Sequence, residues 1–257
     1  MQTECAIEAV SPPLLAGREA LFLDFDGTLT EIVARPELVY IEPALIRLIE
    51  RTQRLIGGAL AVISGRPLKQ IDACLLPLQL PGAGQHGAEL RVHGNATPQR
   101  RVWPGVSAAA EDIRLQYGRD PALIVENKGA SVALHYRAAP ERADECQNFV
   151  RTVAATHGLD VLIGKMVVEA RPRGLHKGRA VETLMTRPLF RDRVPVFVGD
   201  DTTDEDGFAF VQLHGGYGIK VGDGDSAAKF RLDGVAAVHE WLSASTERVA
   251  RDGRLWS

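Results

Sequence analysis

Three short apolar runs, each followed directly by polar residues, constrain the fold of this chain more than any other feature. The runs EALFL, GALAVI and VPVFVG end just before Asp24, Ser64 and Asp200. Helical patterns follow the first two runs, one opened by Pro43 and one by Pro67, and proline is favoured in the first turn of a helix. Strands that alternate with helices predict an α/β fold, a doubly wound parallel sheet covered on both faces.

The polar residues after these runs are expected to meet at one rim of the sheet, because ligands bind beyond the carboxyl ends of parallel strands. Asp24 and Asp26 are two residues apart, so in an extended chain their side chains point the same way and repel each other. A cation or a shared proton between them would remove this repulsion. A solvated turn would also account for the sequence DFDG, but two further polar endings at the same rim favour a metal-binding or catalytic pair.

The segment GDDTTDED places five acidic residues within seven positions. Asp206 fits an exposed loop that caps a helix. Asp200 and Asp201 instead follow a buried strand directly, and carboxylates at the end of such a strand predict a cation with oxygen ligands. Mg²⁺ is the expected cation, because it binds few carboxylates and keeps water and phosphate as its other ligands.

Two further features predict a phosphate group at the same rim. Ser64, Gly65 and Arg66 follow a strand and open a helix, where backbone N–H groups attract phosphate. Lys177, in LHKGRA, begins a later helix. Most lysines simply lie on the surface, but a carboxylate-rich site that handles phosphate needs a fixed cation.

The middle of the chain follows a different order: helix, two strands, helix, two strands. Its two hairpins turn at Asn127–Gly129 and near Gly164-Lys165. This order predicts a small α+β module inserted into the core, with breakers at Pro104-Gly105 before it and at Pro172 after it. We therefore divide the chain into an N-terminal tail (1–18), a core (19–105 and 172–257) and an inserted cap domain (106–171).

Composition argues against several other classes of protein. The formal net charge is only −3, from 30 basic and 33 acidic residues among 257, which gives no reason to expect nucleic acid or a membrane surface as partner. No apolar run approaches the roughly 20 residues of a membrane helix. The three cysteines form no disulfide framework or metal motif, so we expect a cytoplasmic protein that acts on a small molecule. The sequence sets no oligomeric state, and a monomer is compatible with it.

Four motifs in chain order resemble those of the haloacid-dehalogenase superfamily of phosphatases. They are DxDGT from Asp24 to Thr28, Ser64-Gly65-Arg66, Lys177, and GDDxxDED from Gly199 to Asp206. The resemblance implies a Rossmann-like core with a cap inserted between the second and third motifs. The segments GQHGAELR, ENKGASVALHYR and VVEARPRGLHKG further resemble the trehalose-6-phosphate phosphatase branch. One departure is His176, where relatives often have Asn, and we expect it to be tolerated.

The resemblance implies an enzyme that hydrolyses trehalose 6-phosphate to trehalose and phosphate with Mg²⁺, the final step of trehalose biosynthesis. Asp24 would be the nucleophile that forms an aspartyl-phosphate, and Asp26 would be the general acid and then the base. The metal would be held by the Asp24 carboxylate, the Asp26 backbone carbonyl and Asp200. Asp201 would orient a water bound to it.

The resemblance also implies roles for the remaining site residues. Ser64 and Lys177 would bind phosphoryl oxygens, and Asp204 would steady Lys177. Arg66 would bind substrate, and Thr28 would support the site. The cap residues implied to contact sugar hydroxyls are Glu126, Lys128, Arg137, Lys165 and Glu169.

Other functions share parts of this pattern. A phosphatase of the sucrose-phosphate or phosphoglycerate-ester type would have the same core, and only the cap would differ. A haloacid dehalogenase also uses an aspartate at a strand end, but it needs neither Asp26 nor an acidic cluster. An inactive regulator that senses sugar phosphates is a further alternative, against which the intact Asp24, Asp26, Lys177 and Asp200 argue.

Overall fold

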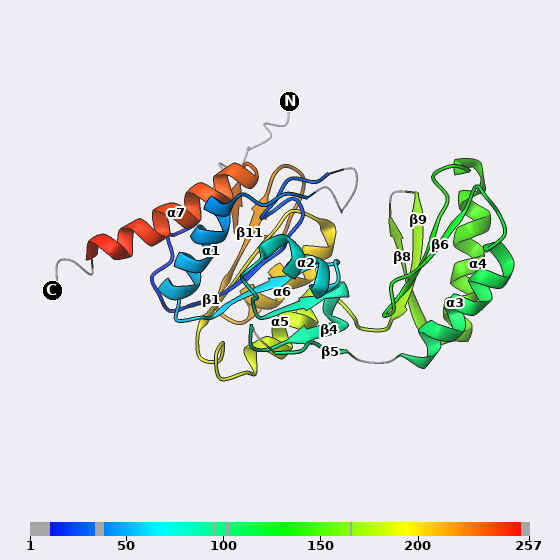
Figure 1. Ribbon diagram of the computed structural model, residues 1–257, viewed down its shortest axis with the longest axis horizontal. Helices are drawn as coiled ribbons and strands as arrows, with labels where there is room; N and C mark the ends of the chain where they lie inside the picture. The colour runs from blue at the N-terminus through cyan, green and yellow to red at the C-terminus, as the bar shows by residue number, and fades with distance from the viewer. Residues whose placement is uncertain (1–10, 34–38, 95, 101–102, 165, 253–257) are drawn as a thin grey trace, which may run out of the picture. The chain divides into compact units, whose positions relative to one another are not determined.

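The computed structural model of the chain contains two compact units. Met1–Pro98 together with His176–Ser257 form one, the core unit, and Gln99–Leu175 form the other, the cap unit (Figure 1). The residues that the structure describes are 11–33, 39–94, 96–100, 103–164 and 166–252.

The core unit is built on a sheet whose strand order is β12-β11-β10-β1-β2-β3-β4. Pairing is parallel from β12 through to β3 and antiparallel between β3 and β4. The strands are β1 (Glu19–Leu23), β2 (Leu60–Ile63), β3 (Gly82–Gly84), β4 (Glu89–Arg91), β10 (Val194–Gly199), β11 (Tyr217–Val221) and β12 (Phe230–Leu232). A further short strand, β5 (Gln99–Arg100), comprises the first residues of the cap unit.

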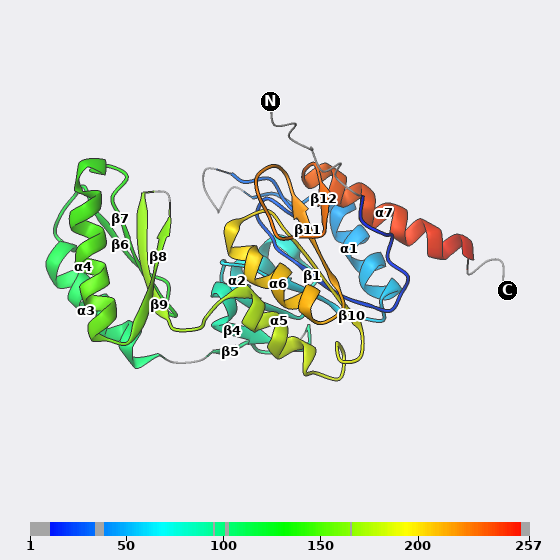
Figure 2. The same cartoon turned by 180° about the vertical axis from the view of Figure 1, so that it is seen from behind.

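Helices cover both faces of this sheet (Figure 2). Along β1, Leu21 and Leu23 belong to one apolar cluster, while Ala20 and Phe22 belong to another, as the alternation of side chains in a strand requires. The first cluster includes residues of α1 (Pro43–Leu55), α2 (Leu68–Leu75) and α7 (Val235–Asp252), and the second includes residues of α5 (Lys177–Met185) and α6 (Glu205–Leu213). The predicted doubly wound sheet is therefore confirmed.

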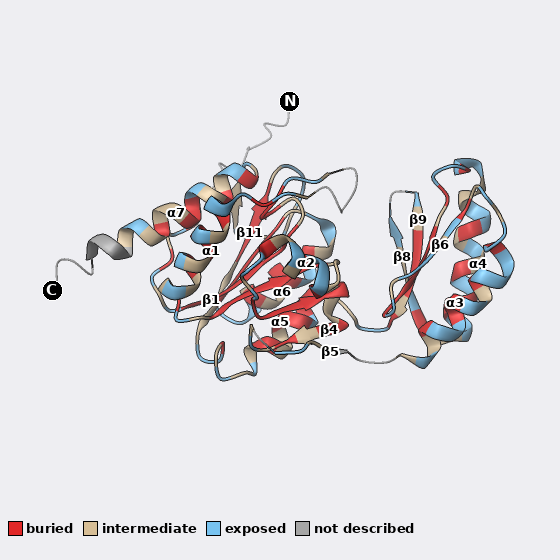
Figure 3. Cartoon of the chain, viewed as in Figure 1, coloured by how far each residue is buried: buried red, intermediate tan, exposed pale blue. Residues whose placement is uncertain are grey.

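The central strands of the sheet are buried over almost their whole length (Figure 3). Phe22, on β1, is fully buried and stacks on Phe190, with ring centroids 5.5 Å apart. Removal of such a buried ring costs about 3–5 kcal/mol. The strand that leads into the site is thus held firmly from both faces.

The cap unit is a four-stranded antiparallel sheet with two helices on one face (Figure 1). Val132, Leu134, Val168 and Ala170 pack with the helices in one apolar cluster. Ala133, His135 and Glu169 alternate with them and so point to the opposite face. The strand order is β6-β7-β9-β8, and the elements are β6 (Ile124–Asn127), β7 (Val132–His135), β8 (Leu159–Gly164), β9 (Val167–Pro172), α3 (Pro104–Tyr117) and α4 (Ala143–Thr156).

The segment Pro104-Gly105 was interpreted as a break before the cap, but it forms the first turn of α3, with Pro104 at the start of the helix. Proline is tolerated there because that position has no hydrogen bond to lose. Gly105 lies close to the end of α4: an added Cβ would lie 2.5 Å from the carbonyl oxygen of His157. The expected cap borders, 106 and 171, lie inside the unit that the structure defines.

The expectations about membrane helices and about cysteines can be compared with the described residues. Among them, no helix combines the length and the apolar character needed to cross a membrane. Cys74 and Cys146 are free thiols, and Cys5 lies outside the described residues.

Candidate active site

The ends of β1 and β10 bring Asp24 and Asp200 together, because these strands are parallel neighbours. The Asp24 N–H donates to the Val198 carbonyl at 2.9 Å and so extends the ladder by one step beyond β1. The hydroxyl of the buried Thr28 donates to Asp200 Oδ1 at 3.4 Å. Gly27 has φ +76°, and a Cβ there would lie 2.1 Å from Asp200 Oδ2. Only glycine lets the turn pass so close to Asp200.

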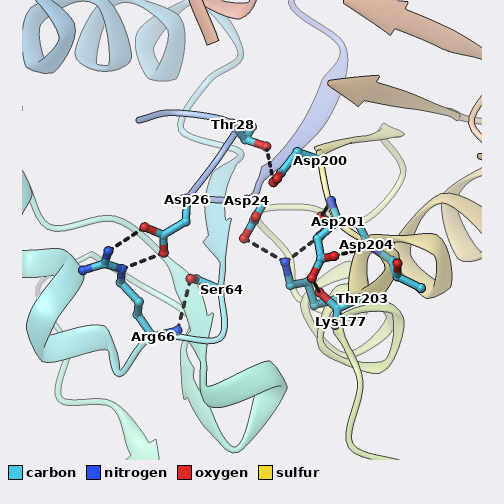
Figure 4. A network of polar contacts seen from close by, with 11 residues as sticks. Asp24, Asp26, Thr28, Ser64, Arg66, Lys177, Asp200, Asp201, Thr203 and Asp204 are labelled. Atoms are coloured by element: carbon cyan, nitrogen blue, oxygen red, sulfur yellow. Dashed lines mark hydrogen bonds and ion pairs between the residues drawn. The ribbon is translucent and has the colours of Figure 1, made fainter. Parts of the chain in front are cut away.

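Lys177 connects this pair of strand ends to the acidic segment after β10 (Figure 4). It is the first residue of α5, and its side chain is only 3% exposed. Its Nζ lies 2.8 Å from Asp24 Oδ1 and 2.6 Å from Asp204 Oδ1. The second oxygen of Asp204 accepts the Asp201 N–H at 2.9 Å. The ion pair between Asp204 and Lys177 that we expected from the sequence is therefore present.

His176, the departure noted in the sequence, precedes Lys177 at the N-cap of α5. Its Nδ1 accepts the Arg179 N–H at 3.3 Å. A helix N-cap needs an acceptor for one of the first backbone N–H groups. The imidazole supplies that acceptor, so His176 caps the first turn of α5.

The electrostatics of the cluster call for an additional positive charge. Carboxylate oxygens of Asp24, Asp200 and Asp204 all lie within 4.8 Å of one another, and Lys177 is the ammonium group that contacts two of them. Burial raises the pKa of Asp24 to about 6 and that of Asp204 to about 7, and it also raises the pKa of Asp200. Burial alone would lower the pKa of Lys177, but Asp24 and Asp204 raise it above its ordinary value. When all three carboxylates are ionised, they and Lys177 carry a net charge of −2, which a divalent cation with oxygen ligands would balance.

Asp201 lies beside the cluster, and its side chain serves the local turn. It caps the short 3₁₀ turn Thr202–Asp204, accepting the Thr202 N–H at 2.7 Å and the Thr203 hydroxyl at 3.4 Å. Asp201 is exposed, whereas Asp204 is buried. Within the described part of the chain, the carboxylates that come together are those of Asp24, Asp200 and Asp204.

Asp26 points toward Arg66, while Asp24 points toward Lys177 (Figure 4). Arg66 donates from Nε to Asp26 Oδ2 at 2.6 Å and from Nη2 to Asp26 Oδ1 at 2.5 Å. The expectation that both carboxylates face the same way assumed an extended chain, and it was wrong. The strand ends at Leu23, and the chain turns between Asp26 and Thr30.

The loop after β2 carries Ser64 and Arg66, and a second loop supports it. Ser64 is buried, and its Oγ accepts the Arg66 N–H at 3.1 Å. Gln85 and His86, both with positive φ (+50° and +56°), donate their N–H groups to the carbonyls of Arg66 and Ser64 at 3.0 Å. Such a conformation is uncommon for residues other than glycine. No sequence pattern indicates this support beyond the two glycines that flank Gln85 and His86 in GAGQHG.

Lys220 is a residue of the site that the sequence reasoning missed. It is 6% exposed, and its Nζ donates to the backbone carbonyls of Asp200 and of Val221, the latter at 3.1 Å. It therefore fixes the backbone of the residue that supplies one of the three clustered carboxylates. The available signal was a lysine within the otherwise apolar strand YGIKVG.

The residues expected to bind sugar lie in the cap unit, apart from one that falls outside the described residues, Lys165. Lys128 Nζ lies 2.6 Å from Glu169 Oε2. Glu126 and Glu169 both pair with Ala133 in the register of the sheet, so they lie on one face. Arg137 is exposed and follows β7.

A doubly wound core with a buried acidic cluster at its rim, together with an α+β unit inserted into the chain, defines a phosphatase of the haloacid-dehalogenase superfamily. The model of the trehalose-phosphatase family matches residues 22–236. Trehalose-6-phosphate phosphatase of Escherichia coli K12 is 38% identical over 239 residues, which cover 91% of this chain and 89% of that protein. The chain belongs to the trehalose-phosphatase family and is therefore a phosphoric monoester hydrolase.

Solved structures have the same fold. The crystal structure of a trehalose-6-phosphate phosphatase related protein has a TM-score of 0.74 at 25% identity and covers 90% of this chain and 99% of its own. The C-terminal domain of trehalose-6-phosphate phosphatase from Candida albicans has a TM-score of 0.76 at 21% identity, with 90% and 93% covered.

Proposed function

We propose that this enzyme hydrolyses trehalose 6-phosphate to trehalose and phosphate, through an aspartyl-phosphate and with Mg²⁺, as the final step of trehalose biosynthesis. The observation that carries the proposal is the buried cluster in which Lys177 contacts both Asp24 and Asp204. The sequence relationship to the Escherichia coli enzyme supports the choice of substrate.

Asp24 is the group suited to attack phosphorus. A bond forms between a carboxylate oxygen of Asp24 and phosphorus while the bond between phosphorus and the sugar oxygen breaks. Asp26 gives its proton to the departing sugar oxygen. It then takes a proton from the water that attacks the aspartyl-phosphate, which releases phosphate and restores Asp24. Lys177 and the Ser64 hydroxyl donate to the phosphoryl oxygens as negative charge develops on them.

The donor set fits Mg²⁺, and its proposed ligands are the carboxylates of Asp24 and Asp200 and the backbone carbonyl of Asp26. When bound, the ion supplies positive charge that draws electrons from the phosphoryl group. Asp204 has both oxygens engaged, one by Lys177 and one by the Asp201 N–H, so its proposed role is to hold Lys177. Asp201, as the cap of the adjoining turn, supports this loop.

The ion pair between Arg66 and Asp26 suggests how phosphate binding prepares the acid. Arg66 contacts both carboxylate oxygens of Asp26 in the structure. A guanidinium group binds phosphate with the same forked geometry. We expect the phosphate of the substrate to take over Arg66, after which Asp26 is released to carry the proton.

The sugar is bound by the cap residues in this proposal: Glu126, Lys128, Arg137, Lys165 and Glu169. The alternatives, a sucrose-phosphate or phosphoglycerate-ester phosphatase, would use the same core chemistry. An inactive regulator would have no use for the arrangement of Asp24 against Lys177. Sites that hydrogen-bond a substrate reject analogues without the matching hydroxyls, so a comparison of substrates separates these functions.

Phosphate release from a panel of sugar phosphates in MgCl2 tests the proposal. We expect trehalose 6-phosphate to have the highest kcat/KM of the panel, above sucrose 6-phosphate and phosphoglycerate esters. A higher kcat/KM for another sugar phosphate would make that compound the substrate in place of trehalose 6-phosphate. No phosphate release from any compound of the panel would favour the inactive regulator.

A further inference from the structure

Two close pairs of charged groups lie on the face of the cap sheet opposite α3 and α4. Lys128 Nζ lies 2.6 Å from Glu169 Oε2, and His135 Nε2 lies 2.9 Å from Glu126 Oε2. The register places Ala133, a small residue, between Glu126 and Glu169 on neighbouring strands. His135 is two residues from Ala133 in β7 and so points to the same face. These residues form a polar platform, defined here as Glu126, Lys128, Ala133, His135 and Glu169.

The pair of His135 and Glu126 is too exposed to be a major support of the fold. Their side chains are 35% and 49% exposed, and ion pairs in such positions add little to stability. The pair does fix the rotamer of a long carboxylate side chain that would otherwise sample several conformations. A binding group that is already held in one conformation loses less freedom when its ligand arrives.

We propose that His135 is a positioning residue for sugar binding: its Nε2–H donates to Glu126 Oε2 and presents the Glu126 carboxylate to the hydroxyl groups of the substrate. The inference rests on the proposed role of Glu126 in sugar recognition. It assigns His135 no contact with the phosphate and no part in the chemistry.

A double-mutant cycle with His135→Leu and Glu126→Ala tests this inference. If His135 acts through Glu126, their effects are not additive. We expect His135→Leu to lower kcat/KM for trehalose 6-phosphate about tenfold, within the range of coupled neighbours, with the loss in KM and not in kcat. In the Glu126→Ala background the same change should alter kcat/KM less than about twofold. Hydrolysis of p-nitrophenyl phosphate, which has no sugar, should be unaffected by His135→Leu.

The cap unit offers a matched control. His157 Nε2 lies 2.7 Å from Asp112 Oδ2, and Asp112 lies on α3, which covers the other face of the cap sheet. His157→Leu removes the same type of contact away from the platform and should leave kcat/KM for both substrates unchanged. His135→Gln, which keeps an N–H donor for Glu126, should recover most of the loss seen in His135→Leu.

Several results would overturn the inference. A tenfold loss that persists in the Glu126→Ala background would mean that His135 does not act through Glu126. Equal losses on p-nitrophenyl phosphate would mean that it supports the fold or the chemistry. An unaltered KM for trehalose 6-phosphate in His135→Leu, or in Glu126→Ala, would show that His135 does not position Glu126 for sugar binding. If the wild type prefers another sugar phosphate, the substrate proposal fails separately, and the same cycle is measured on the preferred substrate.

Discussion

Replacement of Lys177 by methionine would measure how strongly one ammonium group keeps the acidic cluster buried. Methionine has a similar length and no charge. The Lys177 side chain is 3% exposed and makes ion pairs of 2.8 Å and 2.6 Å with Asp24 and Asp204. Loss of one partner from a buried ion pair costs about 3–5 kcal/mol, because the remaining charge stays buried without compensation. For a protein of this size, that loss lowers the unfolding midpoint by about 6–20 °C.

The same variant should respond more strongly to Mg²⁺ than the wild type does. Without Lys177, the cluster of three carboxylates changes from a net charge of −2 to −3. A ligand that binds only the folded state stabilises it more as its affinity increases. We therefore expect MgCl2 to raise the unfolding midpoint of Lys177→Met by more than it raises that of the wild type, although the variant should have lost its phosphatase activity.

Lys220→Met is the matched control for this experiment. Lys220 is also buried, but it donates to two backbone carbonyls, and in the part of the chain that the structure describes no ion pair involves it. Two hydrogen bonds from an ammonium group contribute about 3–6 kcal/mol, so its midpoint should fall by a similar amount. This replacement leaves the charge of the acidic cluster unchanged, so it should not strengthen the response to Mg²⁺. The measurement is thermal unfolding followed by circular dichroism, in chelator and in MgCl2. A Mg²⁺ response in Lys177→Met no larger than in the wild type or in Lys220→Met would refute the reasoning.

Asp24→Asn should lower phosphate release by about 10⁴-fold or more, as expected for loss of a nucleophile, and substantial residual turnover would argue against an aspartyl-phosphate. Chelation should stop turnover reversibly, with recovery on addition of MgCl2; full activity in chelator would exclude a metal requirement. Glu169→Ala should reduce kcat/KM for trehalose 6-phosphate about 100-fold and spare p-nitrophenyl phosphate, unless Glu169 only supports the fold. Gly27→Ala should weaken Mg²⁺ binding in calorimetry, because its Cβ would lie 2.1 Å from Asp200 Oδ2. Gly174→Ala, at φ +66° with no atom within 4 Å of the added Cβ, separates this clash from backbone strain.

The sequence was sufficient to predict the meeting of Asp24 and Asp200. Both follow apolar runs, and a parallel sheet brings the ends of neighbouring strands to one rim. A single lysine or a single acid in a loop has no distinctive spacing. Asp204 could therefore be expected there only through the family resemblance, and Lys177 only because a phosphate site rich in carboxylates needs a fixed cation. Their contact of 2.6 Å joins residues 27 positions apart.

The direction of Asp26 could not be predicted, because it depends on contacts that are distant in sequence. The turn after Asp24 passes close to Asp200, and the hydrogen bond from Thr28 to Asp200 spans 172 residues.

The strand β3 could not be predicted for a different reason. It comprises only Gly82–Gly84, which is too short to show the alternation of apolar and polar residues that indicates a strand. Its first glycine is required by packing, since a Cβ at Gly82 would lie 2.5 Å from the Val62 carbonyl oxygen.

Asp24 and Asp26, the two acidic groups proposed to react, are each engaged by a basic side chain of the core unit. In the core unit, Asp24 contacts Lys177 and Asp26 contacts Arg66. Lys177 and Arg66 are also the groups expected to bind phosphate, so a bound phosphate competes with the two aspartates for the same cations. The carboxylates released from these ion pairs are then available, that of Asp24 for attack and that of Asp26 for proton transfer. Phosphate binding and activation of the two carboxylates would then be one event, which accounts for the presence of both cations in direct contact with the acids they serve.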